Sequence, residues 1–346
     1  MVDVRPVGLR PVARVAGMGA ALPDAVETVA DIEARIERES GGRLPVPRGT
    51  LAAISGIETR HAVGSGEYAS TLAAAAGRAA LADAGVGLAD VDLLLFASTS
   101  SDQVEPATVH NVADAIAYRG GSAFDVKNAC NSFVEGVRVA EAMLASGAAR
   151  RVLVVTGETP TLAARYAVPD RRAFRHAFIG YTVGDAGGAF VLEPSDGDRG
   201  VFYRHSWNAS EHWAVSQVPG GGSRHPRGDD HLYAGGDGGA LRDIVRAFDP
   251  AIATRVFEAT GTTPDDFALF VVHQVTAPFA DEMTERLGLP PGRVERTIET
   301  FGNVASATLP LALVRAREAG RVGPGDNVLF VGLGAGISVA TMAIRL

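Results

Sequence analysis

The feature that most constrains the fold of this chain is an internal repeat with an offset of about 175 residues. Each half contains a helical pattern, a short apolar run, a second helical pattern, a second apolar run and a closing glycine-rich strand, in that order. The matched segments are 70–84 and 241–259, 93–96 and 268–272, the helices opened by Cys130 and Ser306, 152–155 and 328–331, and 184–192 and 332–346. The repeat predicts two similar halves, residues 1–175 and 176–346.

The apolar runs show no alternation of apolar and polar residues. Such runs are typical of strands buried on both faces, in sheets covered by helices on each side, so we expect a layered α/β protein. The least periodic stretch is 193–239, which its composition predicts to be a surface excursion or a mobile loop. Its four histidines lack the spacing of metal ligands, so we expect solvated loop residues and no metal site: His205, His212, His225 and His231.

Charge and cysteine content exclude several classes of function. The formal net charge of −8 argues against a nucleic-acid groove. The only cysteine is Cys130, which excludes an internal disulfide and a zinc site built on paired cysteines. No run approaches the roughly 18 apolar residues of a membrane span, and prolines and arginines interrupt the N-terminal stretch where a signal peptide would be apolar. We expect a cytoplasmic protein without a membrane span.

Cys130 is the first candidate for chemistry. It lies in the segment FDVKNACNSF, which has the pattern of a strand, a tight turn and the start of a helix. A thiol at a helix N-terminus is close to the positive end of the helix dipole and to backbone N–H groups, which lower its pKa below the ordinary value of about 8.5. The alternative is a buried cysteine that acts only as a small hydrophobe.

Two polar residues in the second half are further candidates. His273 ends an apolar strand in VVHQ, and the carboxyl ends of strands in α/β folds are where ligands and catalytic groups gather. Asn303 lies in FGNVAS, a turn leading into the helix equivalent to that of Cys130. The alternatives are a core histidine and a capping or turn asparagine. Because the repeat relates the two helices, we expect the three side chains to converge.

Six motifs together resemble the ketoacyl synthase III group of the thiolase superfamily. They are SGIETR at Arg60, DVKNACNSF at Cys130, VGDAGGAFVL at Gly184, VVHQ at His273, FGNVASAT at Asn303 and the closing VGLGAGISVA. The resemblance is collinear over nearly the whole chain. It implies a five-layered αβαβα fold of two duplicated halves, a homodimer, and an acyl group carried on the cysteine.

The resemblance also implies a role for each residue. Cys130 would attack an acyl thioester and form an acyl-enzyme. His273 and Asn303 would donate hydrogen bonds to the carbonyl of the second thioester and stabilise its enolate. The backbone N–H groups of Cys130 and Gly336 would hold the tetrahedral oxyanion. The glycine run 332–336 does not match a dinucleotide fingerprint, because Ile337 stands where that motif needs a third glycine.

Two positions bear on how substrates bind and react. The segment Val275-Thr276-Ala277-Pro278 lacks the arginine that relatives use to dock a carrier protein or coenzyme A, and Arg60 is the remaining candidate for the coenzyme A channel. Glu105 lies in a loop that in the family reaches the partner subunit's site. Relatives that join two acyl chains without decarboxylation have a glutamate there as the base. The alternative is an exposed loop carboxylate.

We therefore predict an acyltransferase that forms a carbon–carbon bond by Claisen condensation of acyl thioesters, in polyketide or specialised fatty-acyl biosynthesis. No cofactor is expected to be bound permanently, and the substrates are expected to be thioesters of coenzyme A or of an acyl carrier protein. One alternative is acyl transfer from Cys130 to an alcohol or amine. The other is a catalytically silent partner subunit.

Overall fold

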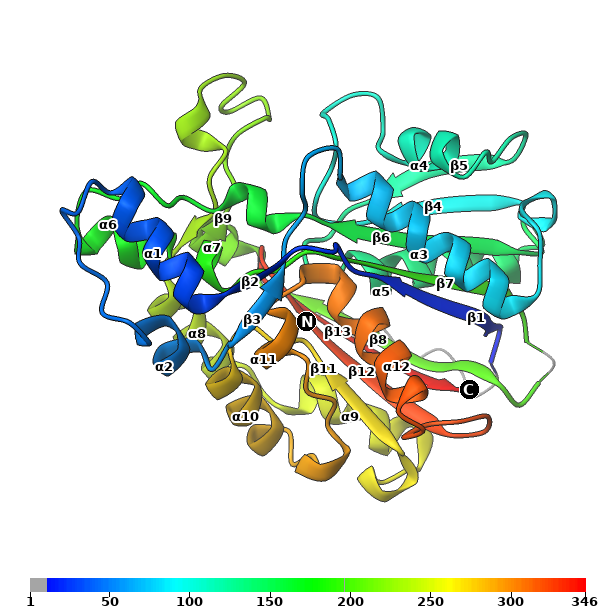
Figure 1. Cartoon of the computed structure of the whole chain (residues 1–346). Helices are drawn as coiled ribbons and strands as arrows, with labels where there is room; N and C mark the ends of the chain where they lie inside the picture. Colours follow the sequence, from blue (N-terminus) through cyan, green and yellow to red (C-terminus); the bar gives the residue numbers. More distant parts are fainter. Residues whose placement is uncertain (1–10, 196) are drawn as a thin grey trace.

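The protein is described by a computed structural model that covers residues 11–195 and 197–346. Two β-sheets organise it (Figure 1). The order of the first sheet is β1 (Ala13–Ala21), β7 (Ala186–Pro194), β6 (Val152–Glu158), β4 (Leu93–Ala97) and β5 (Ser122–Val126). The order of the second is β11 (Leu269–Val272), β12 (Asn327–Gly334), β13 (Ser338–Arg345) and β8 (Gly200–Asn208). The parallel pairs β4–β6 and β11–β12 occupy matching places in the two sheets.

Successive side chains of the buried strands enter different hydrophobic clusters. In β4, Leu95 packs into the cluster between the sheets and Leu94 into the cluster on the outer face. In β12, Phe330 faces the inner cluster and Leu329 the outer one. Both faces of each sheet are therefore covered, as the unbroken apolar runs predict.

Helices supply the three remaining layers. The inner cluster contains side chains of α5 (Ser132–Ala145) and α12 (Thr308–Glu318). The outer face of the first sheet is covered by α3 (Ala69–Ala84) and α4 (Val109–Ala115). The outer face of the second sheet is covered by α8 (Gly238–Ala247), α9 (Ala251–Thr260) and α10 (Ala277–Arg286). The predicted αβαβα order is confirmed.

The duplication extends to the backbone that precedes the two inner helices. Ala129 has φ 47° and Ala305 has φ 48°, both in the left-handed region that residues with a β-carbon rarely adopt. Each alanine comes directly before a residue of the repeat, Cys130 in one half and Ser306 in the other. The same sharp turn therefore delivers one polar side chain in each half.

A smaller cluster of short elements lies at the end of the sheets that holds the candidate site. Its core comes mainly from α1, α2, α6 and α7 and from the segment around Tyr166. The bounds of these and the remaining short elements are β2 (Val26–Thr28), α1 (Val29–Glu39), α2 (Thr50–Ser55), β3 (Thr59–His61), α6 (Arg171–Ala177), α7 (Ile179–Thr182), β9 (Ser216–Gln217), β10 (Gly235–Gly236) and α11 (Ile298–Phe301).

Three boundaries differ from those predicted. The strand β7 pairs with β1 and β6, so the change of sheet falls after Pro194 and not at residue 175. The supposed loop 193–239 contains β8, whose buried start Val201-Phe202-Tyr203 pairs with β13. The helix expected over 241–259 is two helices, because Pro250 has no N–H for a continuous hydrogen-bond ladder.

Candidate active site

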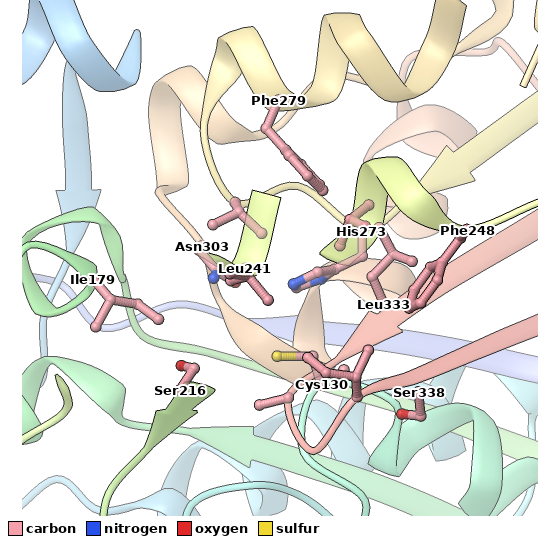
Figure 2. A pocket seen from close by; sticks show the side chains of 15 residues that line it. Cys130, Ile179, Ser216, Leu241, Phe248, His273, Phe279, Asn303, Leu333 and Ser338 are labelled. Carbon is pink, nitrogen blue, oxygen red and sulfur yellow. The ribbon is translucent and has the colours of Figure 1, made fainter. Parts of the chain in front are cut away.

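Cys130 lies on the turn between β5 and α5. The N–H of Asn128 donates to Oγ of Ser132 at 2.8 Å, and that hydroxyl donates to the carbonyl oxygen of Ala129 at 2.6 Å. These bonds hold the turn whose left-handed residue is Ala129. The thiol is placed two residues before α5 and points into a cavity (Figure 2).

The protonation state of Cys130 differs from the prediction. The pKa of the thiol is raised to about 12, mainly by burial and also by repulsion from the carboxylate of Glu158, although the N–H groups of Ala335 and of Cys130 itself act to lower it. Burial disfavours a thiolate more than these N–H groups favour it. The expected lowering of the pKa is therefore wrong, and the resting residue is a neutral thiol.

His273 directly follows β11 and faces the same cavity. Its backbone N–H donates to the carbonyl oxygen of Val331 at 2.8 Å, and its side chain is buried. Burial lowers the pKa of the imidazole to about 4, so His273 is neutral near pH 7. The next residue, Gln274, accepts from the N–H groups of Thr297 and Ile298 and donates to the carbonyl of Glu295. This fixes the backbone after the strand.

Asn303 is held by both its backbone and its side-chain oxygen. Its N–H donates to the carbonyl of Thr182 at 2.8 Å, and its carbonyl accepts from the N–H of Gly184 at 3.1 Å. Its Oδ1 accepts from the N–H of Ala305 at 3.0 Å. With Oδ1 bound in this way, the Nδ2 group is left to donate into the cavity.

The three candidate residues line one cavity of about 60 Å³. Figure 2 shows Sγ of Cys130, the imidazole of His273 and the amide of Asn303 pointing toward the same space. The other lining side chains are nearly all apolar, from Ile179, Leu241, Val245, Phe248, Val275, Phe279, Leu333 and Ile337, with Ser216 and Ser338 as the polar exceptions. The structure therefore brings together a thiol, an imidazole and a carboxamide in an apolar environment suited to an acyl chain.

The closing hairpin between β12 and β13 was expected to place the N–H of Gly336 beside Cys130. It places the N–H of Ala335 there instead. Gly334 and Ala335 line the cavity, and the N–H of Ala335 donates to Cys130. Gly336 has φ 99°, which suits glycine, but it does not line the cavity. The structure thus places the N–H of Ala335 at Cys130, where the sequence analysis expected that of Gly336.

The guanidinium of Arg60 is buried and does not face a substrate-binding cavity. Its side chain is 1% exposed, and its guanidinium donates to the carboxylate of Glu27, to Oη of Tyr166 and to the carbonyls of Gly180 and Val183. All its nitrogens are used within the protein. This burial contradicts the predicted role in the coenzyme A channel, because no N–H remains for a phosphate.

Glu105 lies on the exposed loop between β4 and α4 and does not line the cavity of its own chain. Its neighbour Val104 is 77% exposed. Within one chain the structure therefore does not bring Glu105 to Cys130, His273 and Asn303.

Asn131 is a site residue that the sequence analysis missed. It is buried, and its Nδ2 donates to Oγ of Ser338 at 2.8 Å and to the carbonyl of the same residue at 3.2 Å. A β-carbon at Gly332 would lie 2.0 Å from Oδ1 of Asn131. The side chain thus joins the cysteine turn to the closing hairpin. The available signal was its position directly before Ser132, where α5 begins.

Two parts of the chain match models of one protein family. Residues 124–209 match "3-Oxoacyl-[acyl-carrier-protein (ACP)] synthase III", and residues 257–346 match the C-terminal domain of the same family. The first segment contains Cys130, and the second contains His273 and Asn303.

Whole-length relatives agree with the family models. The chain is 34% identical to the beta-ketoacyl-[acyl-carrier-protein] synthase III of a Roseiflexus species, with 96% of this chain and 98% of the relative covered. It is 33% identical to the synthase of the same name from Rhizobium meliloti, with the same coverage.

Solved structures give the same result. Xanthomonas campestris OleA with bound lauric acid and lauroyl-CoA has a TM-score of 0.84 at 26% identity, covering 97% of this chain and 99% of that one. FabH, the 3-oxoacyl-(acyl carrier protein) synthase III of Pseudomonas aeruginosa, has a TM-score of 0.82 at 26% identity, covering 96% and 98%. The chain belongs to the 3-oxoacyl-[acyl-carrier-protein] synthase III family, the ketosynthase III-like condensing acyltransferases of the thiolase superfamily.

Proposed function

We propose that the protein condenses two acyl thioesters through an acyl group on Cys130. The observation that carries this proposal is the convergence of Cys130, His273 and Asn303 in one apolar cavity, with Nδ2 of Asn303 free to donate. A carboxamide and a neutral imidazole are two donors for one carbonyl oxygen, which is the requirement for stabilising an enolate.

The first step transfers an acyl group to the enzyme. Sγ of Cys130 forms a bond to the thioester carbonyl carbon, the carbon–sulfur bond to the carrier breaks, and the thiol proton passes to the departing carrier sulfur. The N–H groups of Cys130 and Ala335 face the sulfur and are placed to donate to the transient oxyanion. Thiol and imidazole both begin neutral, so no buried ion pair has to be maintained in the resting site.

The second step forms the carbon–carbon bond. The carbonyl oxygen of the second thioester accepts hydrogen bonds from His273 and Asn303, which stabilise its enolate after loss of carbon dioxide or of an α-proton. The enolate carbon attacks the acyl carbon, the bond to Sγ breaks, and Cys130 is released to regain a proton. Because the pKa of His273 is about 4, it remains an uncharged donor throughout the neutral range.

The substrate carrier is coenzyme A or an acyl carrier protein. The relatives are named for the acyl carrier protein, and the OleA structure holds lauroyl-CoA. The apolar lining supports a fatty acyl or polyketide-type chain. No described helix is long and apolar enough to cross a membrane. The cytoplasmic location stays a prediction.

The chain acts as a homodimer that completes the site, with Glu105 as the base delivered from the partner. Two observations support this assignment. The strand β5 is at the edge of its sheet, paired with β4 on one side, so its other side is available for a second copy. The loop before α4 carries Glu105 beside the exposed apolar Val104, outside its own cavity. A base supplied in this way removes an α-proton, so no decarboxylation is needed.

The proposal is tested by intact-protein mass spectrometry with a panel of acyl-coenzyme A and acyl-carrier thioesters, followed by product analysis. An acyl adduct on Cys130 and a β-keto product are expected. An ester or amide product would establish acyl transfer to an alcohol or amine instead. The absence of an adduct with every thioester would establish a silent partner subunit.

A further inference from the structure

Glu158 is a buried carboxylate for which the proposed chemistry has no use. It is the last residue of β6 and is completely buried. Its Oε1 accepts from the N–H of Thr99 at 2.7 Å and from Oγ of Ser306. Its Oε2 accepts from the N–H of Ser100 at 3.0 Å and from Oγ of the same serine at 2.8 Å.

These contacts fix the position of the Glu158 carboxyl group. Both of its oxygens accept hydrogen bonds, and two of the four donors are backbone N–H groups. No arginine or lysine nitrogen of the described residues forms an ion pair with it, and hydrogen bonds alone compensate its burial.

One of these donors occupies the position in the repeat that Cys130 occupies in the first half. Ser306 follows the left-handed Ala305 as Cys130 follows Ala129. Its hydroxyl hydrogen goes to Glu158, so Oγ1 of Thr156, at 2.6 Å, donates to Ser306 in turn. The second copy of the turn therefore directs its side chain behind the site and not into the cavity, whose lining does not include Ser306.

The network connects three parts of the proposed machinery. Ser306 belongs to the same turn as Asn303, whose Oδ1 holds the N–H of Ala305. Thr99 and Ser100 begin the loop that carries Glu105. The carboxylate of Glu158 also raises the pKa of the Cys130 thiol, although less than burial does.

We propose that Glu158 is a positioning residue that ties the Asn303 turn to the loop after β4. The proposal rests on the proposed function, since it concerns the donor Asn303.

Two readouts separate the positioning role from the first step of the reaction. Glu158→Gln should lower kcat for condensation about tenfold while the acyl adduct on Cys130 still forms, because Asn303 acts only in the second step. Unchanged kcat, or an equal loss of adduct formation and condensation, would overturn the positioning role.

Ser306→Ala is the matched variant, because it removes one donor and leaves the carboxylate in place. Its acyl adduct should form as in the parent, whereas its kcat for condensation should fall roughly tenfold with KM for the second thioester retained, since Asn303 acts in the transition state. Unchanged kcat would overturn the positioning role, even if Glu158→Gln does not fold. Absence of an acyl adduct in the parent protein would instead count against the proposed function and not against the contacts of Glu158.

Discussion

Nδ2 of Asn131 donates to Oγ of Ser338 at 2.8 Å, and this contact joins two segments that are 207 residues apart in the sequence. One segment is the turn of Cys130 and the other is the hairpin that places the N–H of Ala335 on the cysteine. This buried amide thus helps to fix the position of Cys130 relative to the N–H of Ala335.

The Asn131 contact predicts a steric coupling with Gly332. Gly332→Ala places a β-carbon 2.0 Å from Oδ1 of Asn131 and should destabilise the protein by about 2 to 3 kcal/mol. Asn131→Ala frees that space, so the double variant should recover more than half of the loss. Urea unfolding of the four proteins of this cycle measures the coupling. Strict additivity of the two changes would contradict it.

Cys130→Ala should abolish the acyl adduct seen as a mass increase on the intact protein, because it removes the sulfur that forms the new bond. Cys130→Ser keeps the size of the side chain and serves as the control for cavity shape. It should bind thioesters with an affinity close to that of the parent while accumulating little or no adduct. An adduct that persists in Cys130→Ala would end the proposed mechanism.

Heterodimers of two different variants should show whether Glu105 acts in the site of its own chain or in that of the partner. Glu105→Gln should lower turnover in the homodimer, since the base for the α-proton is lost. A heterodimer of one Cys130→Ala chain and one Glu105→Gln chain then holds one complete site if the glutamate acts across the interface. Differently tagged chains purified as the heterodimer should regain about half of the parent's activity. A heterodimer as inactive as both homodimers would place Glu105 in its own chain's site or outside catalysis.

His273 should make the free energy of unfolding depend on pH. Its pKa is about 4 in the folded protein, below the ordinary 6.5, because burial disfavours the cation. As the pH falls below 6.5 the unfolded chain takes up this proton first, so the free energy of unfolding decreases down to pH 4 and is unaffected above pH 6.5. The difference amounts to about 3 kcal/mol.

Urea unfolding at pH 4.5 and pH 7 checks this dependence. The loss of stability between the two values should be smaller in His273→Gln than in the parent, because glutamine takes up no proton. His110→Gln is the control, since that side chain is exposed and should change the loss little. Equal losses in parent and His273→Gln would rule out the buried neutral imidazole.

The layers of the fold could be read from the sequence because they depend on local patterns. Apolar runs such as 152–155 fix which segments are buried strands, and the repeat fixes how often the unit occurs. The candidates Cys130, His273 and Asn303 could also be found in the sequence, because each lies close to the end of a strand or helix. Short interruptions of a helix were harder to predict from the sequence. Pro250, for example, divides a segment that periodicity alone predicts to be one helix.

The contacts around the site could not be predicted in the same way. The environment of Cys130 depends on Glu158 and Ala335, which local sequence does not place next to a cysteine. The helix N-terminus was visible in the sequence, but the burial that outweighs it was not. Arg60 illustrates the same limit, since its partners from Glu27 to Val183 are known only once the chain is folded.

The paired turns at Ala129 and Ala305 have a consequence for how this protein can change over evolutionary time. Two copies of one turn in a single chain mean that only one must present a reactive group, and the other is free to specialise. Here the second copy ends in Ser306 and works as scaffold. The two turns are in this sense an asymmetric pair, in which one presents a cysteine to the cavity and the other binds the buried Glu158.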